Sequence, residues 1–135
     1  MLVVVDANEL FSALISRTKT LDIFLDKRVD IVSPKFILKE FEKHSKEIAK
    51  KSGSSEKDLE AFLFLLKPKI KFFKTEYFKE FLIEAKKISP DPDDVEYLAL
   101  AIKLNCPLWS EDKSLREQTK VTVVSTSELL TKLEL

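Results

Sequence analysis

The chain has 135 residues, of which 34% are charged and 44% are hydrophobic. This length is typical of one domain that buries about two-thirds of its unfolded surface, so we expect a single domain over residues 1–135. Lys plus Arg and Asp plus Glu each number 23, so the net charge argues neither for nor against a polyanionic partner. The single Cys excludes an internal disulfide, and with a single His it argues against a Cys/His zinc site.

No segment of the sequence predicts export or membrane insertion. Met1 leads through a short apolar run to Asp6, without the charged region and long apolar core of a signal peptide. No apolar run approaches the length needed to span a membrane. A lone Cys106 suits a reducing compartment, so we expect a cytoplasmic protein that does not associate with membranes.

The chain begins with a β-branched run over residues 2–5, which is typical of a central strand in a parallel sheet. Asp6 ends this run and therefore stands at the carboxyl end of the strand. Asn8 follows, where it can cap the next helix or orient a neighbouring carboxylate. Helical patterns then cover residues 11–15 and 21–25, and a short strand is predicted over 29–32.

A longer helix is predicted after Ser33, with Pro34 in its first turn and its end near Lys51. At 100° per residue, Glu40 falls within the apolar arc of this helix. The other members of that arc are Phe36, Ile37, Phe41, His44 and Ile48. A carboxylate on a buried face is costly unless it is paired, hydrogen-bonded or bound to a metal. Glu40 therefore has either a protein partner, such as a lysine or backbone N–H groups, or a metal ion.

The opposite face of the same helix carries a stripe of lysines. Its members are Lys35, Lys39, Lys43, Lys46 and Lys50. Such a stripe is most often a solvated surface, and the alternative is a binding surface for a polyanion.

Strands and helices continue to alternate after this helix. We expect helices over 56–66 and 75–87, strands over 69–73, 107–109 and 121–124, a short helix after 113 and a last helix from 125. Ser125 and Glu128 have the spacing of a capping box. This alternation predicts an α/β fold of three layers, in which a central parallel β-sheet has helices on both faces.

The stretch from Asp91 to Asp112 places acids at both ends of one helix–loop–strand unit. Asp91 before Pro92 is typical of a helix N-cap, and an apolar face then contains Val95, Leu98, Ala99 and Ile102. Asp94 falls at the edge of that face, whereas Asp93 points elsewhere. Asp112 leaves the carboxyl end of the strand over 107–109, where ligands bind in open parallel sheets. The alternative is ordinary local chemistry, with helix-dipole compensation by Asp94 and a turn at Asp112.

Four carboxylates are thus predicted to converge, namely Asp6, Glu40, Asp94 and Asp112. Carboxylate oxygens are hard ligands that suit Mg²⁺ or Mn²⁺, and clustered acids repel one another without a cation. Metal-assisted phosphodiester hydrolysis is the reaction that such sites serve. The sequence has no glycine-rich phosphate loop and no nucleophile elbow. A phosphoacceptor aspartate is conceivable, but Asp6-Ala7-Asn8 does not match its expected pattern.

The segments LVVVDAN, DPDDVEYLALA and LWSED, together with the helix that carries Glu40, resemble a PIN domain over essentially the whole chain. The resemblance implies a Mg²⁺- or Mn²⁺-dependent endoribonuclease, with the four acids as its catalytic metal ligands. Asn8 and Ser110 match supporting polar positions of the family. Ser114 stands where many members carry a further Asp, which implies one firmly bound ion.

Many small members of this family are toxins of VapC-like toxin–antitoxin pairs. The resemblance therefore implies an RNA substrate, an antitoxin protein as partner and a homodimer. Lys39, Lys43 and Lys46 would then contact RNA phosphates. The competing hypothesis is a PIN-like protein that binds RNA or a partner without cutting.

Overall fold

The computed structural model describes residues 1–16 and 19–135, which form a five-stranded sheet in the order β3-β2-β1-β4-β5. The strands are β1 (Leu2–Val5), β2 (Asp30–Pro34), β3 (Ile70–Phe73), β4 (Leu108–Trp109) and β5 (Val123–Val124). Every neighbouring pair is parallel. The predicted parallel sheet is confirmed, with the β-branched run 2–5 at its centre.

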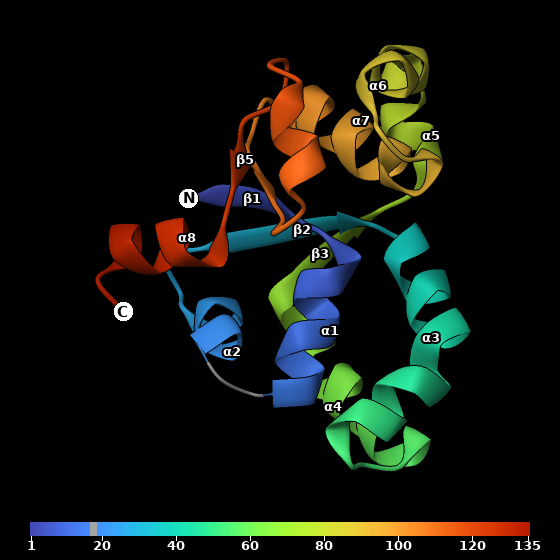
Figure 1. The fold of residues 1–135 in the computed structure, drawn as a ribbon, viewed down its shortest axis with the longest axis vertical. Helices are drawn as coiled ribbons and strands as arrows, with labels where there is room; N and C mark the ends of the chain where they lie inside the picture. The colour runs from blue at the N-terminus through green and yellow to red at the C-terminus, as the bar shows by residue number, and fades with distance from the viewer. Residues whose placement is uncertain (17–18) are drawn as a thin grey trace.

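Helices cover both faces of this sheet (Figure 1). One side carries α1 (Ala7–Ser16), α2 (Lys19–Leu25), α3 (Phe36–Ser52) and α4 (Glu56–Leu66). The other side carries α5 (Thr75–Phe78), α6 (Leu82–Ile88) and α7 (Val95–Leu104). Helix α8 (Thr126–Leu133) packs against α2. Crossovers between parallel strands are right-handed. When the chain changes the direction in which it adds strands to the sheet, the connecting helices therefore lie on the opposite face. The predicted three-layer α/β fold is confirmed.

The reversal occurs at β1 and places a crevice beside it. The chain leaves β1 toward β2 and β3, then returns across the sheet to β4 on the other side of β1. In open parallel sheets, ligands bind at such a switch point, outside the carboxyl ends of the strands. Helix α7 leads into the amino end of β4, so its own amino end lies at this carboxyl edge. The first turns of α3, which follow β2 directly, lie at the same edge.

Pro34 is the last residue of β2, so its prediction in the first turn of a helix is wrong. The β2–β3 pairing continues to Pro34 opposite Phe73, and Lys35 N donates to Phe73 O at 2.8 Å. This pairing delays the helix to Phe36. At its far end the helix closes on Gly53, whose φ of 71° is easily adopted only without a side chain.

Two other predicted elements are shorter or interrupted. The predicted helix over 75–87 is interrupted by a 3₁₀ turn, η2 (Lys79–Phe81). In a 3₁₀ helix, side chains three residues apart lie on the same side, and Phe78 and Phe81 both pack on the core. The predicted strand over 121–124 is reduced to β5. The Gln118 side chain bonds both the N–H and the carbonyl oxygen of Val121, which withdraws these groups from the sheet.

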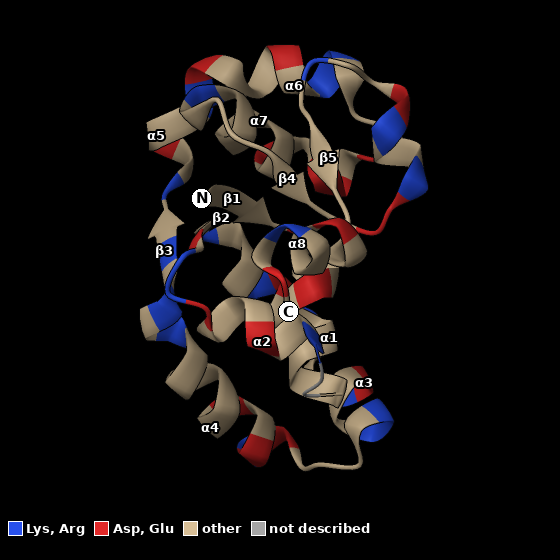
Figure 2. Cartoon of the chain, turned by 90° about the vertical axis from the view of Figure 1, so that its left-hand side faces the viewer, with Lys and Arg blue, Asp and Glu red and all other residues tan. Residues whose placement is uncertain are grey.

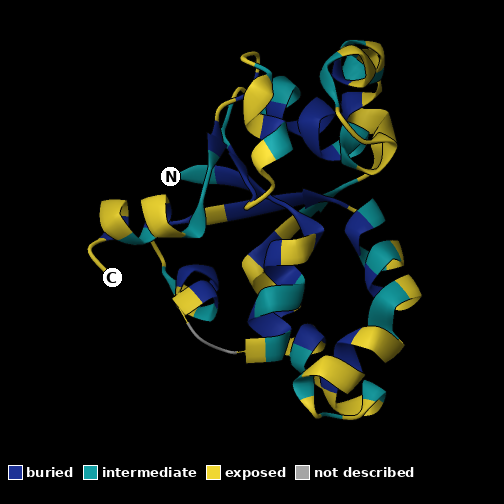
Figure 3. Cartoon of the chain, viewed as in Figure 1, coloured by how far each residue is buried: buried dark blue, intermediate teal, exposed yellow. Residues whose placement is uncertain are grey.

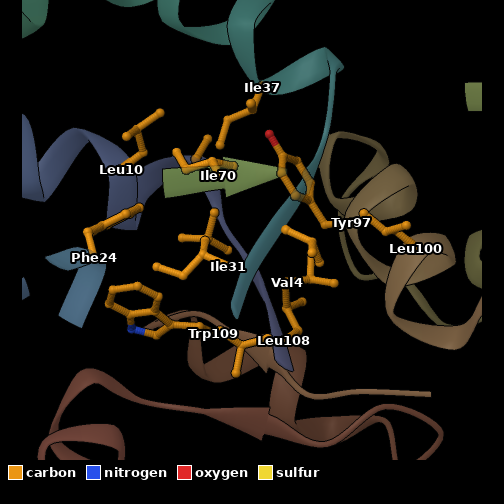
Figure 4. Packing of buried hydrophobic residues seen from close by; sticks show 14 of the residues in the cluster. Val4, Leu10, Phe24, Ile31, Ile37, Ile70, Tyr97, Leu100, Leu108 and Trp109 are labelled. Atoms are coloured by element: carbon orange, nitrogen blue, oxygen red, sulfur yellow. The ribbon is translucent and has the colours of Figure 1, made fainter. Parts of the chain in front are cut away.

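The hydrophobic core lies on both sides of the sheet (Figures 3 and 4). Val3, Val4 and Val5 have no exposed surface, and the Trp109 ring lies 5.2 Å from that of Phe24. In Figure 4 the Tyr97 side chain extends from α7 toward Ile37 on α3, so it crosses from one helical layer to the other. None of the described helices is long and apolar enough to cross a membrane.

Candidate active site

A pocket of about 210 Å³ opens at the carboxyl edge of the sheet, beside the switch point. The predicted acids Asp6, Glu40, Asp94 and Asp112 all line it. They come from four separate elements, since Asp6 follows β1, Glu40 lies on α3, Asp94 precedes α7 and Asp112 follows β4. Asp91, Asp93 and His44 line the same pocket.

Asp6 is the most deeply buried of these acids, at 7% exposure. Its backbone N–H donates to Trp109 O at 3.0 Å, which extends the β1–β4 pairing and brings Ser110 beside it. Ser110 Oγ donates to Asp6 Oδ2 at 2.6 Å, and the backbone N–H of Asn8 donates to Oδ1 at 3.3 Å. Ser110 Oγ also accepts from the Asp112 N–H at 3.1 Å, so one hydroxyl links both strand-end acids.

Glu40 points inward, as the helical periodicity predicts, and its partner is a tyrosine. Tyr97 OH donates to Glu40 Oε1 at 2.6 Å. The Tyr97 side chain is 2% exposed and the Phe36 ring packs 6.5 Å from its ring. Burial, followed by the bond to Glu40, raises the pKa of Tyr97, so the hydroxyl remains a donor throughout the physiological range. Glu40 therefore keeps a fixed orientation, with one oxygen engaged and the other toward the pocket.

Asp94 ends a short 3₁₀ turn, η3 (Pro92–Asp94), that precedes α7. Asp91 caps this turn by accepting from the Asp93 N–H at 2.9 Å, so the predicted cap is present on a 3₁₀ turn instead of an α-helix. Asp94 is half-buried and Asp93 is exposed, although both line the pocket.

The apolar face of α7 differs from the predicted one. Val95 and Ile102 are only half-buried, whereas Tyr97, Leu100 and Ala101 are buried with Leu98 and Ala99. The helix lies between the sheet and the α5–α6 segment, so nearly its whole circumference is covered. Periodicity identifies one face of a helix and does not register a second packed face.

Asp112 is held by Ser114, two residues further along the chain. The backbone N–H of Ser114 donates to Asp112 Oδ1 at 2.9 Å, and its hydroxyl donates to the same oxygen at 2.7 Å. Asp112 is exposed at the mouth of the pocket and caps the 3₁₀ helix η4 (Lys113–Glu117). One carboxylate oxygen of Asp112, Oδ1, is therefore engaged in local structure.

Three acids in the pocket, Asp6, Glu40 and Asp94, resist ionisation. Burial, followed by repulsion from Asp6, Asp112, Asp91 and Glu40, raises the pKa of Asp94 to about 7. Burial also raises the pKa of Asp6 and of Glu40, against the opposing hydrogen bonds from Ser110 and Tyr97. A divalent cation would relieve both the burial cost and the mutual repulsion of these carboxylates.

The donor set fits a hard cation, although its side chains do not yet converge on one point. Across residues 1–16 and 19–135, no three His, Cys, Asp or Glu side chains have the geometry to hold a metal ion as they stand. The oxygens of the four acids are ligands of the type that Mg²⁺ and Mn²⁺ prefer, and the pocket is large enough for an ion with water molecules.

Comparisons with known proteins show the family and the fold of this chain. The family model described as PIN domain matches residues 4–134. The chain belongs to the PIN domain family. Among curated proteins, no match to this chain was found.

Several solved structures share the fold of this PIN domain. VapBC2 from Rickettsia felis, bound to a DNA fragment from their promoter, has a TM-score of 0.70 at 15% identity, covering 93% of this chain and 98% of that chain. PAE2754 from Pyrobaculum aerophilum has a TM-score of 0.71 at 17% identity, covering 98% and 88%. VapBC-1 from nontypeable Haemophilus influenzae has a TM-score of 0.64 at 15% identity, covering 94% and 99%.

Sequence reasoning missed two parts of this PIN domain site. The first is Tyr97, which stands three residues after Asp94 and thus on the same side of the helix, a spacing that could have revealed it. The second is a partly buried chain of hydrogen bonds that involves Trp109, the neighbour of Ser110. Trp109 Nε1 donates to Thr126 Oγ1, and this hydroxyl donates to Glu9 Oε2, both at 3.0 Å. No local pattern links these three residues.

The lysine stripe of this PIN domain lies outside the acidic pocket. Lys39, Lys43 and Lys46 are exposed on α3, and none of them lines the pocket. In Figure 2 basic and acidic residues are interspersed over the visible helices. Whether these lysines contact RNA stays a prediction.

Proposed function

We propose that this PIN domain is a divalent-metal-dependent endoribonuclease that hydrolyses RNA phosphodiester bonds at Asp6, Glu40, Asp94 and Asp112. The observation that carries the proposal is the pocket at the switch point, which these four carboxylates line from four separate elements. Mg²⁺ or Mn²⁺, when bound, would activate water and stabilise charge on the phosphate oxygens.

The chain's own residues fix the orientation of three of the four ligands. Ser110 holds Asp6, Tyr97 holds Glu40 and Ser114 holds Asp112. Burial and the neighbouring acids raise the pKa of Asp94 to about 7, so a bound cation would stabilise its carboxylate. Hydrogen-bonded ligands lose less freedom on binding, so they favour one ion geometry over others.

The proposal extends to protein partners. The relatives from Rickettsia felis and Haemophilus influenzae are VapBC structures, which supports an antitoxin as partner and a role as toxin. Phe64 and Leu65, adjacent on α4, are 73% and 70% exposed, and a contact with an antitoxin would cover them. We place the protein in the cytoplasm, where its single free Cys106 would stay reduced.

Cleavage of mixed single-stranded RNAs in Mg²⁺, Mn²⁺ or EDTA tests the proposal. We expect cleavage only with a divalent cation, and none in Asp6→Asn or Asp112→Asn, because each change removes a charged ligand while keeping its shape. Without metal, both variants should melt at or above the temperature of the parent protein, since repulsion in the pocket falls.

Two outcomes would contradict the proposal. Cleavage that survives EDTA would exclude the metal mechanism. RNA binding without cleavage, in a well-folded protein supplied with Mn²⁺, would favour the competing hypothesis of a non-catalytic RNA-binding PIN domain. The toxin role would be identified by a small protein, encoded next to this chain, that forms a complex with it and stops cleavage.

A further inference from the structure

A second pocket of about 410 Å³ lies between α1 and α3, directly beside the acidic pocket. Both pockets are lined by Asn8, Phe11 and His44, so the two form one continuous groove. The volume lies within the range of about 300–1,000 Å³ that is usual for small-molecule sites. A chain of nucleotides threaded through the acidic pocket would therefore continue into this second pocket.

Aromatic side chains stand at the junction of the two pockets. The rings of Phe11 and His44 lie 6.0 Å apart at an angle of 58°, and both residues are half-buried. The His44 side chain keeps 39% of its surface exposed. Proteins that bind single-stranded RNA place splayed bases on rings of this kind. The junction thus offers a stacking surface one step from the carboxylates.

The rest of the lining suits a nucleotide more than a purely apolar ligand. Ser12 and Asn8 add hydrogen-bonding groups along α1, and buried Ile48 supplies an apolar floor. At the far end the Lys51 Nζ lies 3.2 Å from Glu47 Oε1, and both side chains are exposed. A hydroxyl or amide can pair with a base edge, and a lysine can approach the next phosphate.

We propose that this α1–α3 groove holds the base of the nucleotide next to the scissile phosphate of single-stranded RNA, stacked against Phe11 and His44. The proposal rests on the ribonuclease function and assigns these residues to substrate binding. A duplex would not fit, because its bases are already stacked and paired and cannot enter a side groove.

The test measures the affinity of fluorescein-labelled RNA oligonucleotides that each contain one kind of base. Every protein compared carries Asp112→Asn, so that the RNA stays uncut during the measurement. We expect Phe11→Leu, which keeps apolar volume but removes the ring, to weaken binding by roughly 5- to 100-fold, the range for removing one stacked base. His44→Leu, at a more exposed position, should weaken it similarly and provides a second variant if Phe11→Leu folds poorly. Tyr77→Leu removes an exposed aromatic residue on α5, outside the groove, and should leave the affinity unchanged.

The outcomes separate this proposal from the ribonuclease function. The groove assignment is overturned if Phe11→Leu and His44→Leu bind RNA as tightly as Tyr77→Leu, while the protein without any substitution still cuts RNA. The proposed ribonuclease function would be unaffected by that result. The α1–α3 groove would then be a candidate binding site for a protein partner. If the parent protein neither binds nor cuts RNA, the ribonuclease proposal itself fails. A selective loss of affinity in the two groove variants supports the assignment.

Discussion

Asp93 and Asp94 are adjacent in the chain and line the same pocket, yet they occupy different environments. Asp94 is half-buried among the other acids, whereas Asp93 is exposed. We therefore expect Asp94→Asn to remove most of the cleavage activity, because it removes a charged ligand. Asp93→Asn should keep the activity, with a slightly lower melting temperature from the loss of about 0.3–1 kcal/mol of helix-dipole stabilisation. Cleavage rates at saturating Mn²⁺ and thermal melts measure the two effects.

The opposite pattern would assign the metal ligand to Asp93. A Glu96→Gln variant serves as the control, since Glu96 lies further along α7 and does not line the acidic pocket.

Mutations can distinguish the role of Glu40 from that of Tyr97, its hydrogen-bond donor. Glu40→Gln should abolish cleavage, whereas Tyr97→Phe should reduce it by about 10- to 100-fold, the usual effect of removing a residue that orients a metal ligand. Glu42→Gln changes an exposed acid on the same helix that lines neither pocket, and this variant should cut RNA at the parental rate.

Metal titrations distinguish orientation from ligation. High Mn²⁺ should partly restore Tyr97→Phe, because its carboxylate is still present, but not Glu40→Gln. Equal behaviour of the Glu40→Gln and Glu42→Gln variants would show that Glu40 has no special role.

At the scale of the element, α3 separates its tasks by face. Its apolar face packs on α1, Glu40 enters the acidic pocket, and its lysines face solvent. Replacing Lys39, Lys43 and Lys46 together with Gln should weaken RNA binding and lower the slope of log affinity against log salt by about 0.7 for each lysine that neutralises a phosphate. Equilibrium binding over a range of salt concentrations measures this slope.

A matched control replaces three exposed lysines on other segments, Lys57, Lys67 and Lys69, with Gln. The net charge changes by the same amount in both triple variants. A difference between their salt slopes would therefore come from phosphates bound by the α3 stripe. If both slopes stay equal to that of the parent, the stripe is a solvated surface.

At the scale of the whole molecule, Glu9 joins the first helix to the last through Thr126. Glu9 is 2% exposed, and burial raises its pKa from 4.5 to about 7. The folded state then holds a proton that the unfolded state has lost, so the free energy of unfolding falls as pH rises from about 4.5 to about 7. Glu9→Gln should stabilise the metal-free protein by about 1–3 kcal/mol near pH 8, and the gain should shrink near pH 5.

Chemical denaturation in EDTA at the two pH values measures this difference. A gain of equal size at both would mean that Glu9 does not titrate with folding. Asp58→Asn, at an exposed acid on α4, provides the control and should show no such dependence on pH.

Local patterns in the sequence determined much of this molecule. The β-branched run 2–5 predicted the central strand, and the period of 3.6 residues placed Glu40 on the inward face of its helix. The caps at Asp91 and Ser125 were also readable, because each depends on residues within three positions. Strand order could be anticipated only as a parallel arrangement, from which the meeting of Asp6 and Asp112 at one edge follows.

Only the tertiary structure decided how the acids are held. Ser110 bonds Asp6 across 104 residues, and Tyr97 bonds Glu40 across 57 residues. Such hydrogen bonds depend on which strands become neighbours and on how two helical layers meet over the edge of the sheet, which no local spacing records. The second packed face of α7 and the break in the helix over 75–87 have the same origin, because each reflects side chains that must fit against elements distant in the chain.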